Sequence, residues 1–350
     1  MENNPEAVVA VNIVAWNSMN YLPALFNSLD DQDMPLRVTV VDNASTDGCG
    51  QWLGGEYPFV GVLRNMRNYG FARAHNQAIL LALSWWKEAD LSKRYILVCN
   101  PDVELAPDCL RHMYDYLESH PEIQACNPKL WRAHLKYNDS DQKETVKTKV
   151  IDAMGLFLSR SLRPYDRGAE EEDHGQYDEK TDIFGCRGAC ALYRASAVLA
   201  ASEAQQFFDE DFFAYQEDVD VAWRMRHLGM RAALVPRAVA WHHRGAPSSG
   251  KSGWLSAWIR RRNKPAFINF LSTRNHVWVL VKNLTGREFW HCLLWLMPYE
   301  LAKLAAALFS WAALKGYWTA LAGLPKMLKK RKKWLSVMHT TYKNQSPWFT

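Results

Sequence analysis

The segment YILVCNPDVEL, residues 95–105, joins an apolar run to a polar turn that carries a carboxylate. The run Ile96-Leu97-Val98-Cys99 predicts a buried strand. Asn100-Pro101-Asp102 follows at once, and Asn, Pro and Asp all favour turns. The sequence therefore places the carboxylate of Asp102 at the tip of a buried strand.

The residues before this segment alternate β-rich runs with helical patterns. Such alternation predicts βαβ units and a mostly parallel sheet, and hence an α/β fold. In open sheets of this kind, ligands bind outside the carboxyl ends of the strands. Strands are predicted within residues 7–16, 36–43, 59–65 and 94–100, and helices within 19–29, 47–53 and 70–89.

All four predicted strands end in polar residues, at Asn17, Asp42, Asn65 and Asp102. Each end could be an ordinary turn, but four on the ligand-binding edge favour a shared polar site. The sequence contains neither GxxxxGK[ST] nor GxGxxG, which excludes the P-loop and dinucleotide fingerprints.

The second half offers further candidates. Residues 133–182 are acid-rich and predict either a solvated loop or an acceptor-side lid, and MRAALVPRAVAWHHRG predicts a strand, a turn and a strand. A carboxylate such as Asp102 can hold a divalent ion against a diphosphate, and a second carboxylate, from Glu217-Asp218, can accept a proton from a hydroxyl. His242 could complete a metal shell. Two plainer roles stay open: Asp218 as a helix cap and His242 as an ordinary strand-end residue.

Seven motifs, in order over roughly residues 8–245, closely resemble the family 2 inverting glycosyltransferases. The similarity is greatest to the bacterial rhamnosyltransferase-like branch of cell-surface polysaccharide synthesis. The motifs are VNIVAWN, VVDNASTDG, NYGFARAHNQAI, VCNPDVEL, GACALYR, FDEDFFAYQEDVDVAWRMRHLG and AVAWHHRG. The resemblance implies a GT-A fold and a nucleotide-diphosphate sugar donor.

The resemblance assigns donor-binding residues one by one. Asp42 matches the acidic residue that contacts the nucleobase, and Asn17 lies beside that pocket. Asn68, Gly70 and Asn76 match the segment that closes over the nucleotide.

The resemblance also implies a metal and a base. Asn100-Pro101-Asp102 stands in the place of the DXD metal motif, with Asn100 replacing the first carboxylate, so we expect a weaker metal site there. Asp218 matches the catalytic base with Glu217 beside it, and His242 matches a His that some members add to the metal. The implied cofactor is Mg²⁺ or Mn²⁺.

We therefore expect an inverting, metal-dependent transferase that moves a sugar to a hydroxyl of a lipid-linked glycan. The resemblance favours L-rhamnose from dTDP-L-rhamnose. Galactose, galactofuranose or N-acetylglucosamine from a UDP donor stay open, as do two rival classes: a nucleotidyltransferase that makes sugar nucleotides, and a nucleic-acid-binding protein that uses the basic segments IRRRNK and KMLKKRKKW.

The tail differs from the rest of the chain. Residues 251–350 hold 17 Lys and Arg against two acids, and nine of the 16 Trp. Residues 289–324 are apolar, but charged residues and Pro298 interrupt them, so they predict amphipathic helices lying in the membrane interface and not a spanning helix. Packing as plain core on the catalytic domain is the alternative. Six basic residues would face anionic lipid: Lys326, Lys329, Lys330, Arg331, Lys332 and Lys333.

These patterns predict two parts. Residues 1–250 form the catalytic domain, with a nucleotide-sugar half at about 1–130 and an acceptor half with the base at about 131–250. Residues 251–350 form the membrane-associating region. The N-terminus has no basic region before its apolar residues, which argues against a secretory signal. We expect a peripheral protein on the cytoplasmic side of the inner membrane.

Overall fold

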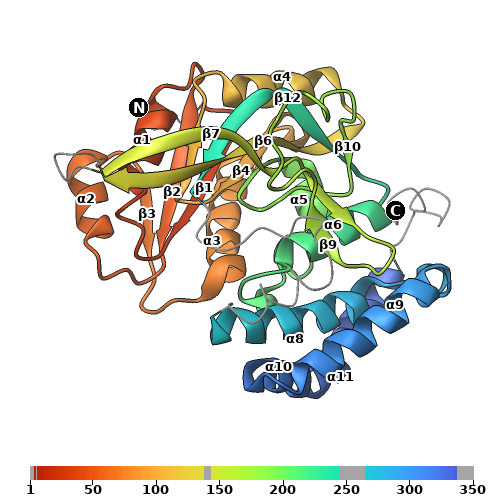
Figure 1. Ribbon diagram of the computed structural model, residues 1–350. Helices are drawn as coiled ribbons and strands as arrows, with labels where there is room; N and C mark the ends of the chain where they lie inside the picture. Colours follow the sequence, from red (N-terminus) through yellow and green to blue (C-terminus); the bar gives the residue numbers. More distant parts are fainter. Residues whose placement is uncertain (1–3, 5, 138–142, 244–264, 337–350) are drawn as a thin grey trace.

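The computed structural model describes residues 4, 6–137, 143–243 and 265–336. A central sheet carries helices on both faces, and a group of C-terminal helices lies against one end of this body (Figure 1). The predicted domain boundary at 250 and the basic segment 259–264 lie outside the described residues.

The first half forms the four parallel strands that the sequence predicts. In the sheet they lie in the order β3-β2-β1-β4. Along the chain, a helix joins each of these strands to the one that follows it in sequence. The strands are β1 (Val9–Ala15), β2 (Leu36–Asp42), β3 (Gly61–Arg64) and β4 (Tyr95–Cys99). The helices are α1 (Leu22–Asp30), α2 (Cys49–Glu56) and α3 (Gly70–Trp85), with a short 3-10 turn at Leu91–Lys93 before β4.

Alternation along the strands explains the two covered faces. Val9, Val11 and Ile13 belong to one apolar cluster with α1 and α2, whereas Ala10 belongs to a second cluster with α3. Successive side chains of a strand point to opposite faces, so a strand with buried apolar residues on both faces needs helices on both sides. The predicted α/β architecture is confirmed.

The second half extends the same sheet. β11 pairs antiparallel with β4, and β6, β12 and β10 follow. The strands are β5 (Val103–Leu105), β6 (Ile123–Tyr137), β7 (Lys143–Ala153), β8 (Leu156–Leu158), β9 (Pro164–Asp166), β10 (Asp182–Ile183), β11 (Cys190–Arg194) and β12 (Arg231–His242). The helices are α4 (Cys109–Ser119), α5 (Ala195–Ala200) and α6 (Glu217–His227), with a 3-10 turn at Glu210–Phe212.

Two expectations for this half need correction. Residues 231–242 form one strand, β12, because a register shift between Val235 and Val239 lets the chain pass Pro236 without leaving the sheet. The expectation of a loop or lid over 133–182 holds only in part: this range contains β7 and the β8–β9 pair, held by main-chain ladders, whereas residues 167–181 are irregular and mostly exposed or half-buried. Buried Asp152 and Asp166 lie in these strands.

The described part of the tail, residues 265–336, forms four helices: α8 (Ala266–Asn283), α9 (Gly286–Ala307), α10 (Trp311–Ala322) and α11 (Leu324–Leu335). They share an apolar cluster with α6, to which Trp223 of α6, Trp278 of α8 and Leu296 of α9 belong. Among the described residues, no helix has both the length and the apolar character needed to cross a membrane.

Candidate functional site

The ends of β1 and β2 meet at one edge of the sheet, where Ala15 is paired with Asp42. Asn17 joins the two loops that follow. Its main-chain N–H donates to Ser45 Oγ at 3.0 Å, and its Oδ1 accepts from the N–H of Thr46 at 2.8 Å. Asn17 adopts a φ of 51°, a left-handed conformation that Asn tolerates better than most residues. The predicted pair Asn17 and Asp42 therefore lies together.

Asp42 is buried at this edge with one oxygen engaged. Its Oδ1 accepts from the N–H of Ser45 at 2.9 Å. Its Oδ2 lies 3.6 Å from Nε of the half-exposed Arg64, and a Cβ at Gly50 would come within 3.0 Å of it. The glycine thus keeps space open beside the carboxylate, as the predicted nucleobase contact requires.

Asn43 connects Asp42 to the segment that follows β3, and sequence reasoning did not single it out. Its Nδ2 donates to Asn68 Oδ1 at 2.9 Å, and its Oδ1 accepts from the N–H of Tyr69 at 3.0 Å. Asn68 Oδ1 also accepts from the N–H of Gly70 at 2.8 Å. The predicted residues Asn68 and Gly70 are therefore brought to the Asp42 edge through one buried amide.

Asn76 faces another way. It lies in α3, buried, and its amide exchanges two hydrogen bonds with the main chain of Phe208, at 2.8 and 3.0 Å. Its Nδ2 also reaches Glu210 at 3.2 Å. In this structure the side chain of Asn76 ties α3 to the loop before α6, and these hydrogen bonds direct it away from Asn17 and Asp42.

Asp102 lies in the turn between β4 and β5, as the segment YILVCNPDVEL predicts. Val103 of β5 is paired with His242 at the end of β12, which brings the imidazole to the carboxylate. His242 Nε2 is 3.3 Å from Asp102 Oδ1, and its Nδ1 is 2.9 Å from Asp152 Oδ2. Burial opposes protonation of His242, but the charges of Asp102 and Asp152 prevail and raise its pKa to about 9.

These residues fit a divalent cation. Asp102 Oδ1 is buried, and His242 Nε2 faces it at 3.3 Å without a hydrogen bond of good geometry, so a divalent cation that displaced the imidazole proton could bind both atoms. Adjacent ligands of an octahedral Mg²⁺ lie about 3 Å apart, close to the 3.3 Å between this oxygen and His242 Nε2. Asp152 would orient the imidazole from its other nitrogen. The described residues hold no cluster of three or more His, Cys, Asp or Glu able to hold a metal, so a cation here would need further ligands from water or from the substrate.

Asn100 lies in the same turn, and its main-chain N–H donates to the carbonyl of Ala189 at 2.8 Å. This bond places the loop 187–189 directly beside the Asp102 turn. Arg187 in that loop was missed from the sequence. Its Nη1 donates to Asp218 Oδ2 at 2.8 Å, and its Nε lies 2.8 Å from Asp166 Oδ1. Burial disfavours the guanidinium charge, but these carboxylates outweigh it and raise the pKa of Arg187.

Glu217 and Asp218 open α6 with both carboxylates buried. The N-cap residue is Gln216, so Asp218 does not cap the helix. Asp218 Oδ1 accepts from the N–H of Val219 at 2.9 Å, and Arg187 holds Oδ2. Glu217 Oε2 has no hydrogen-bond partner among the described residues. Burial, and then the charge of Asp218, raises the pKa of Glu217 to about 8, which keeps this acid mostly neutral at pH 7.

Asp220 is engaged elsewhere. It is fully buried, and it accepts from Arg224 Nε at 2.8 Å, Lys282 Nζ at 2.9 Å and Asn283 Nδ2 at 2.8 Å. These contacts join α6 to α8 and leave the carboxylate no role as a proton acceptor.

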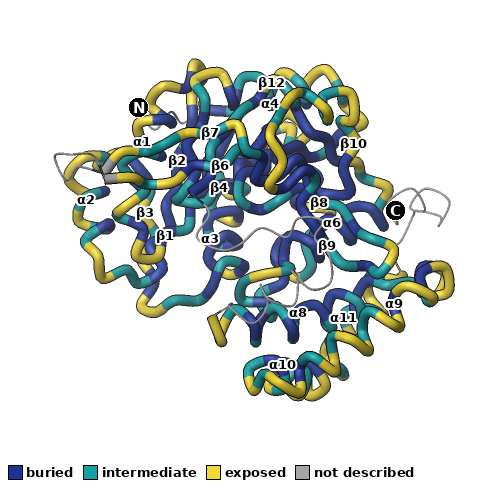
Figure 2. Tube along the Cα trace, in the orientation of Figure 1, coloured by how far each residue is buried: buried dark blue, intermediate teal, exposed yellow. Residues whose placement is uncertain are grey.

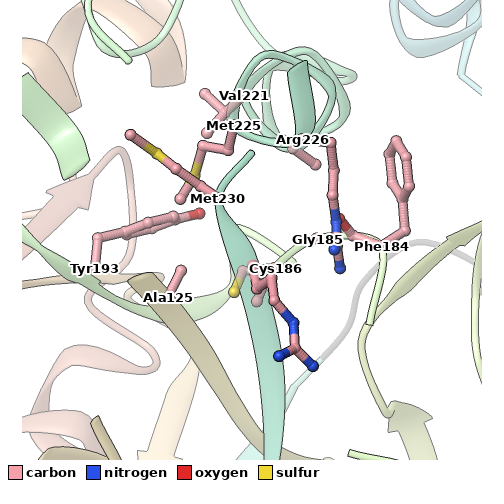
Figure 3. A pocket seen from close by; sticks show the side chains of 12 residues that line it. Ala125, Phe184, Gly185, Cys186, Tyr193, Val221, Met225, Arg226 and Met230 are labelled. Carbon is pink, nitrogen blue, oxygen red and sulfur yellow. The ribbon is translucent and has the colours of Figure 1, made fainter. Parts of the chain in front are cut away.

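A small cavity beneath α6 is separate from this edge. It measures about 10 Å³, room for one water at most, and Figure 3 shows Cys186, Tyr193, Val221 and Met225 around it. None of the predicted site residues lines it. The predicted residues Asp42, Asp102 and Asp218 lie outside this cavity.

Known proteins place this geometry in a family. The sequence matches Glycosyl transferase family 2 over residues 10–199 and Glycosyl transferase family group 2 over 172–338. It is 26% identical to an N-acetylglucosaminyl-diphospho-decaprenol L-rhamnosyltransferase of Mycobacterium tuberculosis over 276 residues, which cover 77% of this chain and 86% of the relative. It is also 26% identical to the rhamnosyltransferase WbbL of Escherichia coli over 244 residues, 67% of this chain and 83% of the relative.

Solved structures agree on the fold. A crystal structure of GalNAc-T7 with UDP, GalNAc and Mn²⁺ superposes with a TM-score of 0.55 at 12% identity. The match covers 79% of this chain and 48% of that one, so the chain spans about half the length of that protein. The family 2 match extends over more than half of the chain. The chain therefore belongs to glycosyl transferase family 2 and is an inverting glycosyltransferase with the GT-A fold.

Proposed function

We propose that this protein transfers L-rhamnose from dTDP-L-rhamnose to a hydroxyl of a polyprenyl-diphosphate-linked glycan in the synthesis of a cell-surface polysaccharide. The observation that carries the proposal is the convergence of a buried acid for the nucleotide (Asp42), a carboxylate–imidazole pair for a cation (Asp102 and His242) and a buried carboxylate beside an arginine (Asp218) at one sheet edge. Two relatives named as rhamnosyltransferases support the choice of sugar.

Asp218 would act as the general base. The acceptor oxygen forms a bond to the anomeric carbon while the bond from that carbon to the diphosphate oxygen breaks, and the hydroxyl proton passes to Asp218. Attack opposite the leaving group inverts the anomeric configuration. Arg187 holds Asp218 in place and carries positive charge beside the departing diphosphate.

Asp102 and His242 would hold a Mg²⁺ or Mn²⁺ ion, which supplies positive charge to the diphosphate when bound. Asn100 adds no second carboxylate, so the donor's own oxygens would provide much of the shell. Asn17, Asp42, Asn68 and Gly70 would line the nucleotide side of the same edge.

The division of labour follows the chain. Residues 1–130 would bind the donor, 131–250 the acceptor and base, and 251–350 the membrane. The tail shows a feature that suits a bilayer: exposed apolar residues recur at spacings of three and four along α9 and its C-cap, and so form a stripe on one side of the helix. Figure 2 shows exposed positions along α9. The stripe consists of Trp290, Leu294, Met297, Leu301, Leu304 and Leu308.

Much of the stripe is exposed to solvent in the described chain. Trp290 is 71% and Leu294 78% exposed, and Trp311 and Trp318 of α10 are equally open at 80% and 75%. Contiguous exposed apolar surface of this kind marks an interaction site, and Trp-rich amphipathic helices suit the lipid interface. We therefore place the protein peripherally, on the cytoplasmic face of the inner membrane where its acceptor would lie.

The basic part of the tail is less available than the sequence suggests. Of the six basic residues of α11, Lys326 and Lys330 pair with Asp211, and Lys333 with Glu203. The exposed Lys329 and Lys332 are left to face lipid headgroups. Apolar insertion of α9 and α10, more than charge, should hold the protein on the membrane.

Flotation with liposomes tests this surface. The protein should float with anionic vesicles, and the triple variant Trp290→Gln, Leu294→Gln, Leu301→Gln should stay in the soluble fraction. Each fully buried large apolar side chain contributes about 1.5–3 kcal/mol, so three of them should change partitioning by at least about tenfold. Because all three side chains are exposed, their replacement should not unfold the chain.

A matched control uses apolar residues that are equally exposed on the catalytic domain. Met66 is 93% and Leu199 57% exposed, and the double variant Met66→Gln, Leu199→Gln should float like the unaltered protein. If the α9 triple variant floated as well as the unaltered protein, the proposal that this stripe binds the membrane would be wrong.

The proposed reaction is tested with a panel of nucleotide sugars, including dTDP-L-rhamnose, UDP-galactose, UDP-galactofuranose and UDP-N-acetylglucosamine, each with Mg²⁺ or Mn²⁺ and a polyprenyl-diphosphate glycan. The dTDP-L-rhamnose reaction should release nucleoside diphosphate. Turnover of only a UDP sugar would replace rhamnose by that sugar. Conversion of the nucleotide sugar and added pyrophosphate to nucleoside triphosphate and sugar 1-phosphate would indicate a nucleotidyltransferase. Nucleic-acid binding without turnover would indicate the other rival class.

A further inference from the structure

The loop that leads into the proposed base, residues 212–216, is held by a helix of the tail. We infer that Asn275 of α8 is a positioning residue for the transfer reaction, which gives the C-terminal helices a role in catalysis distinct from membrane contact. The inference rests on the proposed role of Asp218.

The loop has an unusual backbone. Phe213, Tyr215 and Gln216 have φ values of 65°, 70° and 74°. Positive φ is uncommon for residues other than glycine, and bulky side chains adopt it only where the surrounding structure imposes it. Three such residues within four positions therefore require an outside support.

Asn275 provides that support. It is completely buried, and its Nδ2 lies 2.9 Å from the carbonyl oxygen of Phe212, 2.9 Å from that of Ala214 and 2.7 Å from that of Tyr215. The two hydrogens of this amide are shared among three main-chain acceptors on both sides of Phe213. Arg274 adds Nη2 contacts of 3.0 Å to the carbonyls of Asp211 and Phe212.

The same loop also contacts the start of α3, which carries the predicted donor-binding residue Gly70. The carbonyl of Phe213 accepts from the N–H of Ala72 at 3.1 Å. Gly70 has a φ of 81°, and a Cβ there would overlap the Phe213 carbonyl oxygen and ring. The loop is thus clamped between α8 and the start of α3, and it continues through Gln216 directly into Glu217 and Asp218.

The clamp belongs to the same body as the proposed membrane surface. Trp278, one turn after Asn275, donates from Nε1 to the carbonyl of Ala320 in α10 at 3.1 Å and fills the space above Gly323. α8 lies between α10 and α6, with α9 beside it (Figure 1). Loss of the clamp should therefore impair transfer even to an acceptor in free solution.

The test is the Asn275→Ala variant in the full chain, assayed with a soluble, lipid-free acceptor analogue. A displacement of the base by about 1 Å can cost on the order of 100-fold, so kcat should fall by about that factor. The Kd of nucleoside diphosphate with Mn²⁺, measured by calorimetry, should change less than about threefold. Asn43 fixes the segment of Asn68 and Tyr69 through hydrogen bonds that do not involve residues 212–216.

Asn269→Ala is the matched control. Asn269 lies on the same helix, is also buried, and donates from Nδ2 to Ser310 Oγ at 2.9 Å, a contact within the tail. It should lower the unfolding temperature as Asn275→Ala does, but leave kcat within about twofold. Asn275→Asp keeps the size and loses the donor, and should match or exceed the defect of Asn275→Ala.

The outcomes separate the two roles of the tail. If Asn275→Ala does not fold, Arg274→Met, which removes two loop contacts from a partly exposed side chain, should still lower kcat by about tenfold with Kd unchanged. Equal kcat in Asn275→Ala and Asn269→Ala, or no effect of Arg274→Met, would overturn the inference. An unaltered protein that is inactive with every nucleotide sugar would instead refute the proposed function.

Discussion

An Asp218→Asn variant is expected to bind nucleotide normally and to lose nearly all transfer. The amide keeps the shape of the side chain and can still accept from Arg187, but it cannot take the proton of the acceptor hydroxyl. Loss of a general base costs on the order of 10²–10⁴ in rate, or about 3–5 kcal/mol in the barrier. Steady-state kinetics with saturating donor, together with calorimetric nucleotide binding, would measure both effects.

Glu217→Gln is the comparison variant for this experiment. Because burial and the charge of Asp218 raise the pKa of Glu217 to about 8, its carboxyl is mostly protonated at pH 7, and glutamine imitates that neutral form. We expect a much smaller loss than for Asp218→Asn. If Asp218→Asn turned over at the normal rate while Glu217→Gln were inactive, the base would be Glu217.

An Asp102→Ala variant is expected to abolish detectable activity and to weaken binding of the metal–donor complex. It removes the only carboxylate of the Asn100-Pro101-Asp102 turn, whose buried Oδ1 lies 3.3 Å from His242 Nε2. His242→Ala should do less, because the imidazole would be one ligand among several. Titration of the unaltered protein with EDTA should remove activity, and added Mg²⁺ or Mn²⁺ should restore it.

Asp108→Ala controls for the loss of a carboxylate in the same part of the chain. Asp108 is exposed and contacts His112 on the surface, so the variant should behave like the unaltered protein. Full activity of the unaltered protein in EDTA would show that Asp102 serves another purpose.

Sequence periodicity was sufficient for the first half of the fold. The apolar runs ending at Ala15, Asp42 and Cys99 are buried strands because local pattern and tertiary environment agree there, and the run ending at Arg64 is a partly exposed strand at the end of the sheet. Since parallel strands end at the same edge, the sequence alone was enough to place their polar ends together.

Contacts made across long distances in the chain could not be predicted in this way. Arg187 reads as one arginine in a small-residue turn, and only the fold brings it to Asp166 and Asp218. Asp152 stands in an acid-rich stretch that resembles a solvated loop, yet it is buried against His242. The position of Asn43, directly after Asp42 at a strand end, could have marked it as a candidate from the sequence alone.

The composition of the tail predicted only part of its structure. Composition indicated a basic, Trp-rich surface, and the exposed stripe of α9 agrees with it. Composition did not indicate that Lys330 would pair with Asp209 and Asp211, or that Lys282 would be buried between Asp209 and Asp220. Charges within one segment reveal nothing about acids that lie far away in the chain, so the docking of α8 and α11 on the catalytic domain follows only from the folded arrangement.

A single inverting displacement at the sheet edge is tested most directly by the product of the reaction. The protein is incubated with dTDP-L-rhamnose, a divalent cation and a polyprenyl-diphosphate glycan, and the new glycosidic bond is examined by NMR while nucleoside diphosphate is quantified. We predict one nucleoside diphosphate released per sugar transferred, and an anomeric configuration in the product opposite to that of the donor. Retention of the donor's configuration would contradict a single displacement.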